Sequence, residues 1–482
     1  MIVCIGLFYI YISSILFILS QGNIIAQYEH IDGYQHHIII TLSDEKDSYK
    51  VDIVIDRPCE RDTLRKEHGS ELLQRLMHEL KLGPDEIYVQ LEGATLQTHI
   101  ARQDTECGKY QALIQVPFAG KYRLKVFRVR TGYGAVMEAR KDFPKINYEV
   151  LCDGMVPDRV DETKPYCPKN FGYWVASADN TYFKGPVTVN PNRGLPLKTW
   201  VRTDKLQPVN PGEEPSCSKD IDLYRWNTDT CTKLNKDKKK ALTVGPEVGR
   251  NLIVDKTIMF VGDSHMRGLA DSFRFWLCHD HDPKDFVPLK VEGPDFQEIK
   301  ITDGPCSGFT LRYLALVMCE KDIAHRMSNE DIIILNCGHH PGSGDKYNQG
   351  KGHYTLEKYE NTVRKLFEEL DSTLAEKKIH PLVLWLENSA QPLKQDDYVI
   401  KYGDWRTNHR LLLYHAIVNK ELSKRNIPTV PAFHSTLAAF DKMCDMSHYP
   451  HLTKIPQLNG MLYYIYDRLV PKEALPSEES VK

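Results

Sequence analysis

The stretch Thr257-Ile-Met-Phe-Val-Gly-Asp-Ser-His265 decides the fold of the second half of this chain. Its apolar run has the length of a buried strand, and Gly262 permits a tight turn directly after it. The apolar residues over 267–277 then repeat with helical spacing. A strand, a tight turn and a helix in this order predict the start of an α/β unit, with Ser264 at the mouth of the helix.

The same alternation continues through the rest of 246–482. Strands are predicted at 309–318, 331–336, 381–386 and 428–433. Helices are predicted at 356–377, 406–424 and 454–469. Strands that alternate with such helices predict an α/β fold, a parallel sheet covered on both faces. In such sheets the site lies beyond the carboxyl ends of the strands, so we expect Ser264, Gly338 and the loop after Leu386 at one edge.

Residues 27–150 have the pattern of an Ig-like β-sandwich, because short runs of β-branched and aromatic residues alternate with Gly and Asp clusters. Strands are predicted at 34–41, 49–55, 86–91, 109–116 and 120–129. The last two are expected to form a hairpin across Phe118-Ala-Gly120. A helical pattern at 61–82 is expected to be an insertion, and a Cys59–Cys107 bridge would suit this unit.

Residues 151–245 form a Cys/Trp-rich connecting segment with few periodic runs. Its tryptophans argue against simple disorder. It also holds two close cysteine pairs, 152/167 and 217/231. Disulfides and packing on neighbouring units are therefore expected to hold it in place.

The N-terminus has no charged residue before Glu29, and residues 2–19 are nearly all apolar. A secretory signal peptide over 1–26, cleaved before Gln27, is one interpretation. A single uncleaved membrane anchor is the other, because about 18 apolar residues just reach across a bilayer. Both interpretations send the rest of the chain into the secretory pathway, either secreted or on the lumenal side of the Golgi or cell surface.

Cysteine usage and charge bound the class of protein. Eleven cysteines follow Cys4 with no CxxC pair, which favours disulfides over zinc or thioredoxin-like chemistry. Because eleven is odd, at least one thiol is free or pairs with another chain. The formal net charge is -3, and the densest basic cluster, residues 233–240, is expected to be a solvated linker. Nucleic acid is therefore not an expected partner.

Ser264 is the candidate nucleophile, because the N–H groups and dipole of a helix start can face a developing oxyanion. The alternative is that the Gly-Asp-Ser triplet only caps a helix. A serine nucleophile needs a base, and the base needs an orienting partner. Asp445-Met-Ser-His448 offers both on one turn. It lies between the last predicted strand and the final helix, from where it can reach the same sheet edge as Ser264.

Gly-Asp-Ser-His-x-x-Arg near the start of an α/β domain, with Asp-x-x-His near its end, resembles the PC-esterase branch of the SGNH/GDSL hydrolases. That branch includes the trichome-birefringence-like polysaccharide O-acetyltransferases, the sialic acid O-acetyltransferase and the neurexophilin-and-PC-esterase proteins. Asn336-Cys-Gly-His339 resembles an Asn-x-Gly-His block of the plant proteins. A sandwich ahead of the catalytic domain is similar to the neurexophilin-type layout.

The resemblance implies that Ser264 is the nucleophile, His448 the base and Asp445 its orienter. It also implies oxyanion donors near Ser264 and Gly338, with His339 in the place of a usual Asn. For His339 the alternative is a histidine that fills a loop, and for Arg267 it is an arginine on a helix surface. The implied site is therefore Ser264, Asp445 and His448 as catalytic residues, with Gly338, His339 and Arg267 as oxyanion or substrate residues.

The same triad would serve an O-acetyltransferase, in which a sugar hydroxyl takes the acyl group from Ser264, or an acetylesterase, in which water does. The family relatives favour transfer onto glycans. A glycan is then the expected partner, and an acetyl donor such as acetyl-CoA is the expected cosubstrate, with no bound cofactor. A catalytically inert binding protein is the third interpretation. His279-Asp-His281-Asp282 has metal-ligand residue types but lies in a polar loop, so no metal site is predicted.

Overall fold

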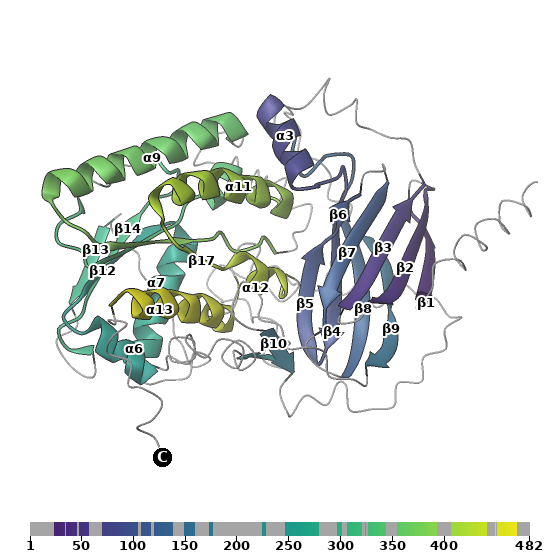
Figure 1. Ribbon diagram of the computed structural model, residues 1–482, viewed down its shortest axis with the longest axis horizontal. Coiled ribbons are helices and arrows are strands. Elements are labelled where there is room, and N and C mark those ends of the chain that lie inside the picture. The colour runs from purple at the N-terminus through teal and green to yellow at the C-terminus, as the bar shows by residue number, and fades with distance from the viewer. Residues whose placement is uncertain are drawn as a thin grey trace, which may run out of the picture.

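The structure is a computed structural model with two sheet-based halves (Figure 1). It describes residues 24–33, 35–45, 48–56, 70–104, 108–116, 120–137, 149–159, 173–176, 224–227, 246–278, 296–300, 306–320, 323, 326–343, 354–392, 406–440, 449 and 451–469.

Two antiparallel sheets make up the first half (Figure 1). The first sheet consists of β1 (Ile24–Ile31), β2 (His37–Glu45), β3 (Ser48–Ile55), β7 (Lys109–Gln115) and β6 (Arg102–Gln103), in that order. The second consists of β11 (Tyr224–Asn227), β10 (Tyr173–Ala176), β5 (Thr95–Ile100), β4 (Glu86–Gly93), β8 (Gly120–Arg130) and β9 (Glu149–Arg159), in that order. A short helix, α3 (Glu71–Glu79), lies between β3 and β4 along the chain.

Alternating side chains fill the space between the two sheets. Ile38 and Ile40 of β2 and Leu124 and Val126 of β8 belong to one buried cluster that takes residues from both sheets. Each strand can contribute in this way because successive side chains point to opposite faces. Strand β4 is the exception, since all eight of its residues are buried. Its outer face is covered by the second half of the molecule, as the shared contacts below show.

The predicted hairpin between the fourth and fifth strands is wrong. β7 pairs with β3 and β6 in the first sheet, whereas β8 pairs with β4 and β9 in the second. The chain therefore crosses from one sheet to the other between these two strands. Alternation sends apolar side chains toward the interior in either arrangement, so it does not choose the pairing partner.

The second sheet extends beyond residue 150, where the sandwich was expected to end. β9 runs to Arg159, and β10 and β11 add two strands from the connecting segment. Trp174 pairs with Trp226 in these strands. At the other end, β1 begins at Ile24, inside the predicted leader. A helix was predicted at 61–82, and the described residues of this range contain the shorter helix α3.

The second half contains a six-stranded sheet, which confirms the predicted α/β class. Its strands are β13 (Phe296–Lys300), β14 (Thr310–Ala315), β12 (Thr257–Gly262), β15 (Ile332–Leu335), β16 (Leu382–Leu386) and β17 (Thr429–Val430), in that order. All neighbours are parallel except β13, an antiparallel edge strand that the apolar pattern did not reveal. The helices are α6 (Pro246–Ile253), α7 (Ser264–Cys278), α8 (His339–Ser343), α9 (Leu356–Lys377), α11 (Asn408–Arg425), α12 (Phe433–Leu437), η10 (His451–Lys454) and α13 (Ile455–Leu469).

Helices cover both faces of this sheet, as predicted (Figure 1). Ile258 and Phe260 of β12 point to the face covered by α7 and α13. Met259 and Val261 of the same strand point to the face covered by α9 and α11. The predicted strand at 428–433 is shorter than expected, because Phe433 already begins α12.

The two halves share one hydrophobic core. The cluster under α9 and α11 continues into α3, β4 and β8. Phe440 lies edge-on to Tyr88 of β4 and Phe127 of β8, with ring centroids 5.1 Å and 5.2 Å apart. Contacts of this kind hold the sandwich on the α/β half as a packed layer.

Two disulfides are described, and both belong to the α/β half. Cys278 pairs with Cys306, and Cys319 pairs with Cys337. Such bonds fit an oxidising compartment. Cys152 is a buried free thiol, so the suggested 152/167 pair is wrong and the expected unpaired cysteine is found. The suggested Cys59–Cys107 and 217/231 pairs lie outside the described residues.

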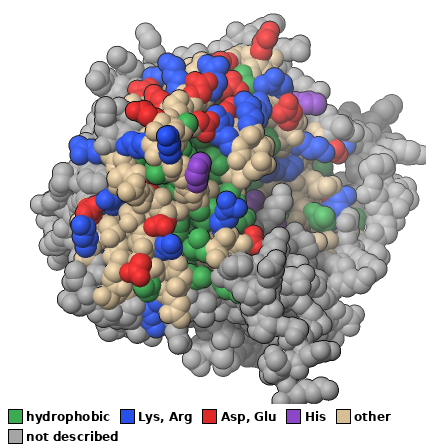
Figure 2. Space-filling view, turned by 60° about the vertical axis from the view of Figure 1, so that its left-hand side comes forward, with side chains coloured by type: hydrophobic (Ala, Val, Ile, Leu, Met, Phe, Trp, Pro, Cys, Tyr) green, Lys and Arg blue, Asp and Glu red, His purple; other side chains and the backbone are tan. Residues whose placement is uncertain are grey.

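The described residues bear on two properties, membrane insertion and surface charge. None of their helices is long and apolar enough to cross a bilayer. On the face shown in Figure 2, acidic and basic side chains are interspersed.

Candidate active site

Ser264 is the first residue of α7, two positions after the end of β12. The helix begins three residues earlier than its apolar pattern indicates. Gly262 makes the turn possible, because a Cβ there would lie 2.7 Å from Cβ of Met266 and 3.1 Å from the carbonyl oxygen of Asn336. A larger residue would push β12 and α7 apart.

Asp263, not Ser264, caps this helix. Its carboxylate accepts a hydrogen bond from the His265 N–H at 2.9 Å, and its carbonyl oxygen accepts one from the Arg267 N–H at 3.0 Å. The Tyr313 hydroxyl holds the same turn by donating to the Asp263 carbonyl at 3.2 Å. Capping is therefore supplied by the neighbouring residue, and it does not explain the serine.

The loop after β15 lies against this turn. The Asn336 N–H donates to the Val261 carbonyl at 2.9 Å, which carries the parallel pairing one residue beyond β15. A Cβ on Gly338 would lie only 2.3 Å from Nδ2 of Asn388, so the loop after β16 approaches Gly338 as closely as a glycine allows. The predicted meeting of the loops after β12, β15 and β16 at one sheet edge is confirmed.

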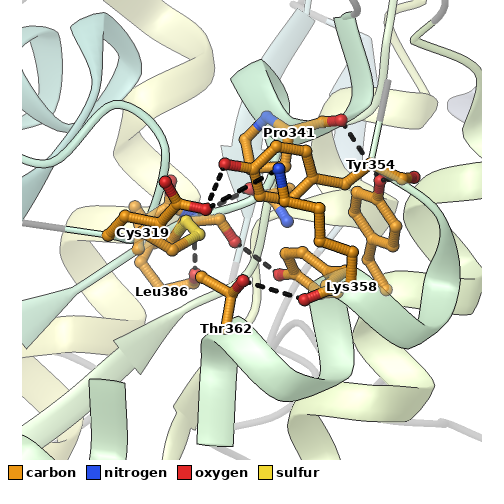
Figure 3. The surroundings of a disulfide bond; sticks show 12 residues. Cys319, Pro341, Tyr354, Lys358, Thr362 and Leu386 are labelled. Carbon is orange, nitrogen blue, oxygen red and sulfur yellow. Dashed lines mark hydrogen bonds and ion pairs between the residues drawn. A yellow bond between two sulfur atoms is a disulfide. The ribbon is translucent and has the colours of Figure 1, made fainter. Parts of the chain in front are cut away.

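The Cys319–Cys337 disulfide holds the same loop from its other side (Figure 3). Cys337 immediately precedes Gly338, and the Tyr359 hydroxyl of α9 donates to its carbonyl at 2.7 Å. Figure 3 also shows Tyr354 and Lys358, whose ammonium lies 3.6 Å from the Tyr354 ring centroid. A covalent bond and a buried hydrogen bond thus fix the backbone that leads into Gly338.

His339 is fully buried at the start of α8. Its ring stacks on that of His265, with centroids 4.0 Å apart and 15° between the planes. Its Nδ1 lies 2.7 Å from Nε2 of Gln391. The stack places His339 beside the residue that follows Ser264. His265 belongs to the Gly-Asp-Ser-His motif but was given no role, and the polar stretch that begins at Gln391 was expected to be an ordinary loop.

Buried amides gather at the same edge. The Asn336 amide donates to the Leu386 carbonyl at 2.9 Å and to Oδ1 of Asn388 at 3.1 Å. Among the described residues, no hydrogen-bond partner is found for Nδ2 of Asn388, Oδ1 of Asn336 or Oδ2 of Asp263. Buried polar atoms are nearly always satisfied, so three such atoms at one edge mark a place where hydrogen-bonding capacity is available.

Charged groups also surround the start of α7. Lys454 is buried, and its Cε lies 4.0 Å from the Cβ position of Gly268, one turn after Ser264. Burial lowers the pKa of Lys454 to about 8, while Asp263 acts in the opposite direction. Arg267 is exposed on the surface of α7.

Asp445 and His448 lie outside the described residues, and so does the polar loop at 279–282. The described segments on either side of the Asp-x-x-His motif are ordered parts of the core, since Phe440 and Tyr449 are both buried. The next element, η10, contacts α7. Within the part of the chain that the structure describes, no group of three or more His, Cys, Asp or Glu side chains could hold a metal ion.

The described arrangement provides a hydroxyl at a helix start, spare buried amide groups and a stacked pair of imidazoles. Such a site can bind and polarise a carbonyl group. No protein-family model and no curated protein matches this chain.

Proposed function

We propose that this chain transfers acyl groups onto glycans through Ser264, as a carbohydrate O-acetyltransferase of the secretory pathway. The observation that carries the proposal is the position of Ser264. It begins α7 directly after β12, Asp263 has already taken the capping role, and the loop with Gly338 lies alongside. The six-stranded sheet and the antiparallel sandwich support an SGNH-type hydrolase fold preceded by an Ig-like unit.

The proposed chemistry has two steps. Oγ of Ser264 attacks the carbonyl carbon of an acetyl donor while its proton passes to His448, which Asp445 orients. N–H groups at the start of α7 and at Gly338 stabilise the oxyanion. The bond between the acetyl carbon and the rest of the donor then breaks, and that leaving group takes the proton from His448. A sugar hydroxyl then attacks the acetyl carbon of acetyl-Ser264 and gives its proton to His448. The bond between the acetyl carbon and Oγ breaks, Oγ takes the proton back from His448, and the sugar leaves as its acetyl ester.

The first experiment tests the nucleophile. The full chain is treated with a fluorophosphonate probe, and the labelled residue is found by peptide mass spectrometry. We expect label on Ser264 and none on the Ser264→Ala variant. Ser272→Ala is the matched control, because Ser272 lies in the same helix, is buried, and donates to the Gly268 carbonyl at 2.8 Å. Unlabelled Ser264 in folded protein would favour an inert binding protein.

The second experiment separates transfer from hydrolysis. The full chain receives radiolabelled acetyl-CoA and a panel of neutral and acidic glycans, and acetylated glycan is measured against free acetate. Acetylated glycan supports the proposal, while rapid deacetylation of acetylated glycans without transfer supports an esterase. The Ser264→Ala variant should lose at least about 10³-fold of either activity, because the remaining groups cannot form the acyl-enzyme.

A further inference from the structure

The Gln391 side chain contacts the imidazole ring of His339. The Gln391 side chain is buried, and its amide Nε2 lies 2.7 Å from Nδ1 of His339. With the Gln391 amide in this orientation, its NH₂ group donates and Nδ1 of His339 accepts. The neutral imidazole then holds its proton on Nε2, and the other edge of the ring becomes a donor.

Gln391 is held in turn by the first residue of α11. The Gln391 N–H donates to Oδ1 of Asn408 at 2.6 Å, and Nδ2 of Asn408 donates back to the Gln391 carbonyl at 3.1 Å. This pair of hydrogen bonds fixes the backbone from which the Gln391 side chain extends. Because Asn408 belongs to α11, these hydrogen bonds fix the position of the loop after β16 relative to that helix.

Strand β4 of the sandwich completes the connection. Nδ2 of Asn408 also donates to the Tyr88 hydroxyl at 2.6 Å, and that hydroxyl donates to Oε1 of Glu86 at 2.6 Å. The Asn408 N–H donates to the same carboxylate oxygen at 3.0 Å. Glu86 therefore accepts hydrogen bonds at the N-terminus of α11, where the helix dipole favours a negative charge.

The carboxylate of Glu86 is ionised despite its burial. Burial alone would raise the pKa of Glu86, but Arg130 and His409, together with the hydrogen bonds, outweigh it and lower the pKa. Nη1 of Arg130 lies 3.0 Å from Oε2. A charged, paired and fully buried carboxylate is a rigid acceptor, since breaking such a pair leaves an uncompensated charge.

We propose that this row of hydrogen bonds, Glu86–Tyr88–Asn408–Gln391–His339, makes the sandwich a positioning part of the active site, setting the tautomer and orientation of His339. All five side chains belong to residues less than a tenth exposed. The apolar contacts of Phe440 already join the two halves, so adhesion alone does not require a polar path. A continuous row of buried hydrogen bonds favours one geometry more strictly than apolar packing does. The catalytic consequence rests on the proposed acyl transfer, whereas the tautomer does not.

The first test removes one hydroxyl far from the site. Tyr88→Phe keeps the ring and its packing on Phe440 but breaks the row. Tyr110→Phe is the control, because Tyr110 is an equally buried sandwich tyrosine whose hydroxyl accepts from the Asp85 N–H at 3.0 Å and takes no part in the row. We expect Tyr88→Phe to lower kcat at least 10-fold with KM within 2-fold, and Tyr110→Phe to leave kcat unchanged. Equal kcat values in the two variants would overturn the proposal.

The second test needs no activity. Nitrogen-15 spectra of histidine-labelled full chain, with the His339 signals assigned from a His339→Gln variant, report the tautomer directly. We expect the proton on Nε2 in the wild type, and loss of this single tautomer in Gln391→Met and in Tyr88→Phe. A proton on Nδ1 in the wild type, or an unchanged tautomer in both variants, contradicts the proposal. If the variants change the His339 tautomer but the wild-type protein transfers no acyl group, the positioning of His339 by the row stands and the proposed function is rejected.

Discussion

The sandwich and the edge of the α/β half beside Ser264 bury polar groups in different ways. In the sandwich the buried charges are paired: Nη1 of Arg128 lies 2.6 Å from Asp32, and the Lys125 ammonium lies 2.6 Å from Glu92. At the ends of β12, β15 and β16 the buried groups are mostly amides and imidazoles, and Nδ2 of Asn388 and Oδ1 of Asn336 have no partner among the described residues. Single atoms for which the described residues offer no partner also occur in the sandwich, such as Nε of Arg128.

Buried ion pairs and buried neutral amides respond differently to the loss or arrival of a partner. A buried ion pair is complete in itself, and losing one partner leaves an uncompensated charge. A neutral amide with an unused donor can meet a ligand at little desolvation cost. The paired charges of the sandwich favour one geometry, whereas the edge beside Ser264 holds an amide donor, Nδ2 of Asn388, with no partner among the described residues.

The largest expected effect is on the stability of the sandwich. Arg128→Met removes the buried ion pairs that Arg128 makes with Asp32 and Glu149, so we expect the free energy of unfolding to fall by about 3–5 kcal/mol. Urea unfolding at pH 7 measures it. Lys50→Met is the control, because the Lys50–Asp52 pair is solvent-accessible and should contribute less than about 1 kcal/mol. Equal losses in the two variants would erase the distinction between buried and accessible pairs.

The second prediction concerns the catalytic edge. Gly338→Ala forces Asn388 away from the loop, because the new Cβ would lie 2.3 Å from its Nδ2. We expect the rate of acyl transfer to fall about 100-fold, since displacing one oxyanion donor costs that much. Gly342→Ala, in the helix α8 that follows Gly338, is the control, because the nearest atoms lie 3.6 Å from the added Cβ, an ordinary contact. A Gly338→Ala enzyme with wild-type kcat would remove this loop from the mechanism.

The third prediction concerns pH and the core between the halves. Burial lowers the pKa of His415 to about 4, whereas the unfolded chain keeps it near 6.5. Between these values the unfolded state binds more protons, so this contribution to stability falls as pH decreases from about 6.5 to 4. From pH 7 to 5 we expect a loss on the order of 2 kcal/mol, which His415→Gln should remove. Thermal melts of both proteins across this range measure it, and parallel pH slopes would contradict it.

The smallest expected effect is the loss of stability when one of two threonine helix caps is removed. Oγ1 of Thr407 accepts from the Arg410 N–H at 3.0 Å and donates to the Ala135 carbonyl at 2.6 Å, across to the sandwich. Oγ1 of Thr355 caps the start of α9 by accepting from the Lys358 N–H. We expect Thr355→Ala to cost about 1 kcal/mol and Thr407→Ala about 2 kcal/mol, because the latter also orphans a buried carbonyl. Denaturant titrations that give the same cost for both would argue against the interface contribution.

Much of the α/β half was predictable because its signals are local. The bounds of α9 match the prediction, since an amphipathic repeat begins after a capping Thr355 and ends in a left-handed Lys378. The strand–turn–helix at Ser264 needs only β12, Gly262 and the apolar spacing of α7. The roles of Asp445 and His448 remain predictions, since both lie outside the described residues.

The sequence by itself determined most of the element types, the two-part organisation into a sandwich followed by a parallel sheet, and the edge at which Ser264 lies. These depend on periodicity and on the rule that sites form at strand ends, both of which operate within one unit. Only the tertiary structure decided that the chain crosses between sheets after β7 and that Gln391 meets His339. It also joined Asn408 to Tyr88, residues 320 positions apart. Packing of the whole molecule selects such partners, because the sequence around the Tyr88 hydroxyl or the Asn408 amide does not indicate which group it will bind.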